Sequence, residues 1–391
     1  MKEYNDLGMV EGKMTHTLSR ITLILMAVLF VSQLPFFSTH AQETTANSSI
    51  ITEQHPDLLI ILSPQYEKDI DIHTAIHSYL TAVYNDLGWT SRIIPIYEDE
   101  NTYQQIDNII ETTYSNHPVK ACIMVGEDLN TALGGDCHYL EQPSTLPWST
   151  LGGTITYELT EQGIICKPTT LNICVSLLYP THELSYEQKK SSIISVFHKF
   201  TIQRHTTNPN NIRVFESSDL NTNSKAMYQK LSDHGTLSYT EDATNFDISA
   251  SLTKSYAAFF IHGHSTPAGT DVNTQKNIGW FTAENLDTLQ TPFFGADGCY
   301  AGGWWSNQQD NNKLDSSIDG SWYGSKIFTS THIRVMALGL LSQNGFSTPV
   351  SFLENVVPEL LTGKTLAEAM IGDTCIGDFI IVGDPTFHFT I

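Results

Sequence analysis

Basic side chains are scarce in this chain. Its 391 residues include 20 Lys and Arg against 42 Asp and Glu, and the formal net charge is −22. A nucleic-acid-binding protein needs clustered cations to follow the phosphates, and no stretch of the sequence supplies such a cluster. The composition therefore argues against a nucleic-acid partner, and the acidic excess favours solubility.

The sequence also lacks an apolar run that is long enough to span a membrane. The longest run near its start, Ile21 to Val31, is soon broken by polar residues and proline, and falls short of the ~20 residues that a spanning helix needs. Arg20 precedes this run, and small residues lead up to Ala41, which is the pattern of an export signal. We predict a signal peptide over 1–41 and a short linker over 42–56. The mature protein would then be secreted or held in the periplasm or cell envelope. The export signal would be the only segment that contacts a membrane. The alternative is that this segment is not cleaved and anchors the protein.

Closely paired cysteines are absent as well. The six cysteines are Cys122, Cys137, Cys166, Cys174, Cys299 and Cys375. Without a C-x-x-C spacing, no zinc site is indicated. If Cys299 is a free thiol, the remaining five cannot all pair in disulfides.

Short apolar runs alternate with helical patterns from Asp57 onward. In the first half we expect strands at Leu58–Leu62, Ile93–Ile96, Val119–Val125 and Asn172–Leu178, helices over 73–87, 102–115 and after Ser185, and an irregular segment over 129–170. Gly88 is a suitable C-terminal cap, and Ser185 with Gln188 makes a capping box. The alternation predicts an α/β protein with a mostly parallel sheet covered by helices.

A polar linker around Arg204–Asn211 divides the chain. We therefore predict two consecutive α/β sub-domains, over 57–204 and 211–391. In the second half we expect a strand at Ile212–Phe215, a helix over 222–232, a strand or helix at Ile333–Leu341, helices opened by capping boxes at Ser351/Glu354 and Thr365/Glu368, and a final apolar strand before Gly383.

The candidate chemistry lies between Tyr256 and Trp305. One apolar run ends at His262-Gly-His264, and a second ends at Asp297-Gly-Cys299. Parallel strands bring their carboxyl ends to one edge of a sheet, where ligands bind. A histidine and a cysteine that meet there can form a site with a cysteine nucleophile. Cys299, at a strand end before a glycine-rich turn, has the part-exposed position that a reactive thiolate needs.

The same residues resemble a known family. A histidine followed by a cysteine 35 residues later, each beside small residues, resembles the caspase-like clan of cysteine peptidases, and within it the gingipain family. Three segments carry the likeness: Gly263-His264-Ser265-Thr266, Pro292 to Cys299 with Gly302, and the apolar run into Gly383-Asp384-Pro385. The resemblance covers about residues 57–391 and implies a three-layer α/β/α fold.

The resemblance also implies roles for these residues. Cys299 would be the nucleophile, a histidine would protonate the leaving amine, and the backbone N–H groups of Cys299 and Ser265 would form the oxyanion hole. The protein would be an exported cysteine endopeptidase that acts on proteins or peptides through a Cys–His dyad and requires no cofactor. No acidic residue occupies 164–168, where the family carries its specificity acid, so no preference for a basic substrate residue follows.

Two histidines compete for the second catalytic role. His262 is followed by glycine, as the histidine of the clan usually is, whereas His264 is preceded by glycine, as in gingipains. We favour His264 and keep His262 as the alternative. On one extended strand the two side chains would share a face, so a metal site with Asp297 is a further alternative. Asp297 itself is expected to act as a structural hydrogen-bond acceptor.

Other interpretations of the sequence remain open. The carboxylate-rich loop Asp310–Gly320 is a candidate for calcium, which gingipains bind, although it does not follow the EF-hand pattern. A catalytically inactive scaffold or binding protein of the same fold is the competing class of function. A transpeptidase acting in protein secretion is a third possibility.

Overall fold

The computed structural model describes most of the chain after the predicted export signal. The described residues are 55–97, 103–126, 129, 132–134, 142–151, 157–160, 163–166, 169–181, 184–204, 210–220, 228–266, 268–276, 278–298, 301–302, 322–339, 349–372, 374–375 and 379–389. The predicted signal peptide and nearly all of the linker lie outside them. Within these ranges, no helix is both long enough and apolar enough to cross a membrane.

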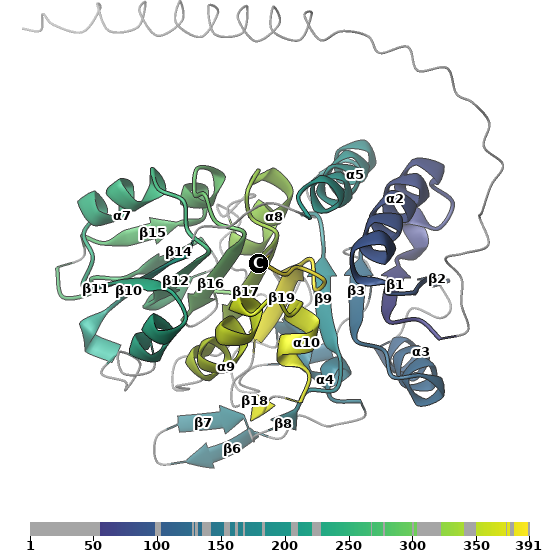
Figure 1. Cartoon of the computed structure of the whole chain (residues 1–391), viewed down its shortest axis with the longest axis horizontal. Coiled ribbons are helices and arrows are strands. Elements are labelled where there is room, and N and C mark those ends of the chain that lie inside the picture. Colours follow the sequence, from purple (N-terminus) through teal and green to yellow (C-terminus); the bar gives the residue numbers. More distant parts are fainter. Residues whose placement is uncertain are drawn as a thin grey trace, which may run out of the picture. The chain divides into compact units, whose positions relative to one another are not determined.

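A ten-stranded, mostly parallel sheet forms the centre of the protein (Figure 1). Its strands, in order across the sheet, are β11 (Thr236–Glu241), β10 (Asn211–Glu216), β12 (Ala258–His262), β16 (Phe293–Asp297), β17 (Val335–Gly339), β19 (Phe379–Gly383), β9 (Cys174–Leu178), β3 (Ala121–Val125), β1 (Leu58–Leu62) and β2 (Ser91–Pro95). The predicted α/β class and mostly parallel sheet are confirmed. Most of these strands are apolar runs buried on both faces, which is typical of parallel sheets.

The sheet consists of two parallel blocks that run in opposite directions. Strands β2, β1, β3, β9 and β19 are parallel to one another, and so are β11, β10, β12, β16 and β17. The blocks meet where β17 pairs antiparallel with β19. The strands of the second block therefore all end on one side of the sheet, along the strand direction, and the strands of the first block end on the opposite side. Apart from β19, the blocks follow the predicted sub-domains over 57–204 and 211–391, a division that stays a prediction.

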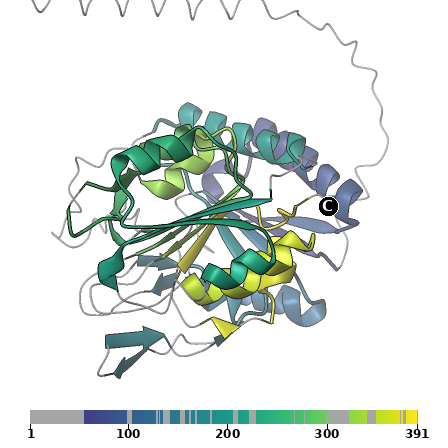
Figure 2. The ribbon, with the colours of Figure 1, turned by 60° about the vertical axis from the view of Figure 1, so that its left-hand side comes forward.

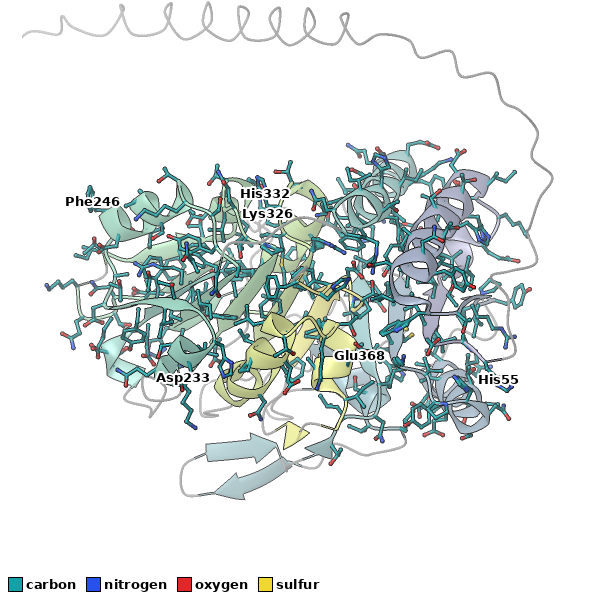
Figure 3. All side chains as sticks on the ribbon, in the orientation of Figure 1. His55, Asp233, Phe246, Lys326, His332 and Glu368 are labelled. Atoms are coloured by element: carbon teal, nitrogen blue, oxygen red, sulfur yellow. The ribbon has the colours of Figure 1, made fainter. Side chains whose placement is uncertain are left out.

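Helices cover both faces of this sheet. They are α2 (Ile70–Leu87), α3 (Tyr103–Asn116), α4 (Leu146–Ser149), α5 (Tyr186–Ile202), α7 (Asn245–Leu252), α8 (Lys326–Thr329), α9 (Pro349–Leu361) and α10 (Leu366–Met370). In two views, α2, α5, α7 and α8 lie on one face, and α3, α9 and α10 lie on the other (Figures 1 and 2). Lys326 of α8 and Glu368 of α10 accordingly lie on opposite sides of the sheet (Figure 3). The helices and the sheet make three layers, α/β/α.

The helix boundaries show which capping predictions hold. Gly88 caps α2 with a φ of 70°, in the left-handed region that glycine adopts easily. The capping boxes at Ser185 and Thr365 open α5 and α10 as predicted. The capping box at Ser351 is wrong, because α9 begins at Pro349 and already contains that serine.

Several short elements differ from the sequence prediction. The segment over 129–170 was expected to be irregular, but its described parts hold α4 and the strands β4 (Ala132–Gly134), β5 (Gln142–Ser144), β6 (Tyr157–Thr160), β7 (Gly163–Cys166) and β8 (Thr169–Thr170). Strands β4–β5 and β6–β7 pair antiparallel, and β8 pairs with β18 (Thr374–Cys375). Neither β11 nor α7 was expected. Of the helix predicted over 222–232, residues 222–227 lie outside the described residues, 228–230 are helical as predicted, and 231–233 form a short 3-10 helix, η4. The segment over 333–341, left open between strand and helix, contains strand β17.

Candidate functional site

Three adjacent strands end at titratable side chains in a single row. Strands β10, β12 and β16 are parallel neighbours, and their register aligns Glu216 with His262 and His262 with Asp297. Side chains at matching positions of neighbouring parallel strands point to the same face. At the carboxyl ends of these strands, the imidazole of His262 therefore lies between the carboxyl groups of Glu216 and Asp297.

This row is buried and closely spaced. The three residues are 4 or 5% exposed. His262 Nδ1 lies 3.0 Å from Glu216 Oε1, and Nε2 lies 3.6 Å from Asp297 Oδ2. The hydroxyl of Tyr239, on the neighbouring β11, donates a hydrogen bond to Glu216 Oε2. Both ring nitrogens of His262 thus face carboxyl groups inside the protein.

The surroundings of the row raise the pKa of both His262 and Asp297. Burial raises the pKa of Asp297 to about 7; the charge of His262 acts in the opposite direction, and that of Glu216 adds to the rise. For His262, burial acts to lower the pKa, but the charge of Asp297 and the hydrogen bond with Glu216 outweigh it. The row therefore binds protons more tightly than the same side chains do in water.

His264 has a different environment from His262. It begins β13 (His264–Thr266), an edge strand of a small antiparallel sheet with β14 (Gly269–Asp271) and β15 (Trp280–Thr282). Its side chain is 54% exposed, and its Nε2 lies 3.2 Å from Asp219 Oδ2. No hydrogen bond joins its Nδ1 to any part of the chain that the structure describes. Within the described residues, His264 therefore has one oriented nitrogen, Nε2, and one nitrogen without a hydrogen bond, Nδ1.

Asp219, which faces His264, is itself held in place. Ser217 Oγ donates to Asp219 Oδ1 at 2.6 Å, and Thr274 Oγ1 donates to the same atom at 3.2 Å. Burial acts to raise the pKa of Asp219, but the hydrogen bond from Ser217 and the charge of His264 bring the net pKa below its usual value. Asp219 is therefore an ionised carboxylate at neutral pH, directed at His264.

The expectation that the two histidines lie on one continuous strand is wrong. Strand β12 ends at His262, and Gly263 separates it from β13, which belongs to the other sheet. One imidazole is buried and the other is half-exposed, and they face different carboxylates. The residues that the structure describes contain no group of three His, Cys, Asp or Glu arranged to hold a metal ion. The proposed calcium loop at 310–320 lies outside the described residues.

Cys299 lies outside the described residues, but the glycine before it is described. Gly298 packs directly on the segment that carries His264. A β-carbon added to Gly298 would lie 2.3 Å from Gly263 O and 2.1 Å from Ser265 Oγ, which is closer than real contacts allow. Gly263 N also donates to Asp297 O at 3.1 Å. The residue next to Cys299 is therefore in contact with both neighbours of His264.

Ser265, whose backbone N–H was predicted to serve the oxyanion hole, is 7% exposed. Its hydroxyl lies 2.8 Å from Thr270 Oγ1, and the hydroxyl of Tyr323 donates to the same threonine at 3.0 Å. These bonds fix the strand that follows His264. The role of the Ser265 N–H stays a prediction.

Sequence reasoning missed Glu216 and Asp219. The available signal was a carboxylate that ends a buried strand, since Glu216 follows Val214 and Phe215 directly. The strand 212–215 was recognised, but its alignment beside β12 was not, so Glu216 was not placed next to His262.

Asp297, expected to be a structural acceptor, has an Oδ2 that accepts no hydrogen bond from the described residues.

The comparisons with known proteins add no identification. No protein-family model matches the chain, and no curated protein matches it.

Proposed function

We propose that this chain is an exported cysteine endopeptidase of the gingipain type, with Cys299 as nucleophile and His264 as its partner. The proposal rests on sequence motifs for Cys299 and on geometry for His264. One observation carries it, namely the packing of Gly298 against Gly263 and Ser265. This contact keeps the residue beside Cys299 against the segment of His264. The caspase-like version of the three-layer fold is part of the same proposal.

His264 suits the dyad better than His262 on three grounds. It is half-exposed, so that a substrate can reach it, whereas His262 is buried. Its Nε2 faces Asp219, which fixes the ring and leaves Nδ1 for a thiol. In His262, carboxyl groups face both nitrogens. A carboxylate that orients a catalytic imidazole and stabilises its protonated form is a recurrent arrangement in hydrolases.

The reaction would proceed in two steps. The imidazole of His264 takes the proton of Cys299, and the thiolate attacks the peptide carbonyl carbon. The oxyanion is stabilised by backbone N–H groups, and His264 then protonates the leaving amine as the C–N bond breaks. Water attacks the resulting thioester and releases the acid. Asp219 stays ionised throughout and pairs with the imidazolium.

The test compares Cys299→Ala, His264→Ala and His262→Ala at equal concentrations of folded protein. Cleavage of a random peptide library is the measurement. We expect no turnover from the first two variants and reduced turnover from the third. Full activity in Cys299→Ala would end the peptidase proposal, and an active His264→Ala beside an inactive His262→Ala would reverse the choice of histidine.

Two additions to this experiment, an electrophilic thiol probe and an added amine, address the two other candidate functions. An inactive scaffold would leave the library uncut and Cys299 no more reactive than an ordinary thiol toward an electrophilic probe. A transpeptidase would join the acyl fragment to an added amine in preference to water. Mass spectrometry of the products separates these outcomes.

A further inference from the structure

The row of Glu216, His262 and Asp297 is not used by the proposed dyad, yet it lies directly beside it. Ser217 N donates to His262 O at 2.9 Å, and Gly263 N donates to Asp297 O at 3.1 Å. Ser217 in turn holds Asp219. The three segments that carry Asp219, His264 and Cys299 are therefore continuous with the three members of the row.

The row is incompletely hydrogen-bonded. Among the described residues, Asp297 Oδ2 and the hydroxyl of Tyr228 are buried without a hydrogen-bond partner. The charge of Asp297 acts on Tyr228 and raises its pKa, after the larger effect of burial. An ionised carboxylate with no donor is costly inside a protein. The 3.6 Å gap between His262 Nε2 and Asp297 Oδ2 is also too long for a good hydrogen bond.

Few charges are available to balance the row. Glu216 from β10 is one member, and Asp219 from η3 (Ser218–Leu220) acts on His262 from one side. Among the described residues, Tyr239 from β11 and Tyr228, just before η4, are the other titratable groups that face it. Strand β17, on the far side of β16, contributes only apolar residues and glycine. With both carboxyl groups of the row ionised, one imidazolium would leave a net negative charge in the interior.

We propose that Glu216, His262 and Asp297 form a buried proton-sharing row that positions the segments of His264 and Cys299. With its extra proton, the row is compact: His262 is an imidazolium between its two carboxyl neighbours, and Asp297 is a carboxylic acid. When that proton leaves for solvent, Asp297 becomes a second buried carboxylate that shares one imidazolium with Glu216, and the end of β16 next to Gly298 shifts to hydrate it. His262 and Asp297 are positioning residues, and ionisation of Asp297 sets the upper limit of the pH range in which the dyad is aligned.

This inference rests on the proposed function only in taking Cys299 as the reactive thiol. The first measurement is the rate at which iodoacetamide alkylates Cys299, followed by mass spectrometry of its peptide from pH 6 to pH 8.5. Thiolate formation increases this rate in every variant. Loss of the row's proton should lower the rate in the wild type but not in Asp297→Asn, so the ratio of Asp297→Asn to wild type should rise about tenfold between pH 6 and pH 8. Asp233→Asn, which changes an exposed carboxylate (Figure 3), is the matched control and should give a constant ratio.

The second measurement does not depend on catalytic activity, and it uses a variant only to assign the signals. The ring ¹⁵N signals of His262, assigned by their loss in His262→Gln, should show a doubly protonated imidazole at pH 6.5 and a change in shift near pH 7 as Asp297 ionises. A neutral His262 throughout pH 6–8 would overturn the proposal, and so would a constant ratio for Asp297→Asn. If peptides are not cut but both measurements give the expected results, the row is established and the peptidase proposal alone fails.

Discussion

Replacing Asp384 should cost more stability than replacing any exposed carboxylate of this protein. Asp384 is completely buried after β19. Its Oδ1 accepts hydrogen bonds from Tyr79 Oη at 2.7 Å and from Thr386 Oγ1 at 2.6 Å, and its Oδ2 accepts one from Arg334 Nη2. Arg204 Nη1 lies 3.9 Å from Oδ2. Burial acts to raise the pKa of Asp384, but the two arginines bring it below its usual value.

Asp384→Asn keeps the size of the side chain and removes its charge. Arg204 retains its ion pair with Asp86 at 2.6 Å, whereas Arg334 keeps a hydrogen bond to the carbonyl of Gln203 and its place over the Phe387 ring, with no second carboxylate beside it among the described residues. One buried guanidinium is thus left without a counter-charge. Removing one partner of a buried ion pair typically costs about 3–5 kcal/mol, and we expect a loss of that size.

The assay is urea unfolding followed by circular dichroism, with Asp287→Asn as the control. Asp287 pairs with Lys326 at 2.7 Å but is 42% exposed, so its replacement should cost less than about 1 kcal/mol. Because the pKa of Asp384 is lowered in the folded state, its contribution is present above about pH 4 and disappears as the pH falls through the folded value. The difference between wild type and Asp384→Asn should therefore shrink in acid. Equal losses for the two variants at pH 7 would refute the reasoning.

Two further predictions concern the candidate site and the export signal. Gly298→Ala should reduce peptide cleavage by about 100-fold at equal folded concentration, because the added methyl group overlaps Ser265 Oγ and displaces the residue next to the nucleophile. Gly88→Ala meets no atom within 4 Å and should cost about 1 kcal/mol from its left-handed backbone without a loss of turnover; similar activity in the two variants would contradict the proposed contact. The exported protein should begin close to Ala41, and an amino-terminal sequence that still contains Met26 would contradict the export signal.

The sequence predicted the elements of the fold better than their arrangement. Uninterrupted apolar runs such as Leu58–Leu62 mark buried strands, and Gly88 marks a helix end, because both signals are local. Strand β11 was missed because Thr236–Glu241 lies at the edge of the sheet, where Leu237 and Tyr239 alternate with polar residues and form no apolar run. The direction of β19 was not predictable, because the sequence of a buried apolar strand does not show whether it pairs parallel or antiparallel with its neighbours.

The candidate site depended on this missing information. His262 and His264 have similar neighbours in the sequence, and only the break at Gly263 separates a buried imidazole from an exposed one. Glu216 and Asp219 come from a strand and turn more than 40 residues earlier, and the pairing of β10 with β12 brings them to the histidines. Such pairing follows from long-range packing, which no local pattern encodes.

The position of β19 also has a consequence for the order of folding. This strand is the last of the sheet to be synthesised, yet it lies between β17 and β9, and its pairing with β9 closes a loop of about 200 residues. Until Phe379–Gly383 is available, β9 and β17 are open edges on a four-stranded and a five-stranded piece. Open apolar edges invite pairing with other chains, and distant pairings form slowly. A nascent chain of this protein should therefore depend on a chaperone, or on being kept unfolded, until its final strand has emerged.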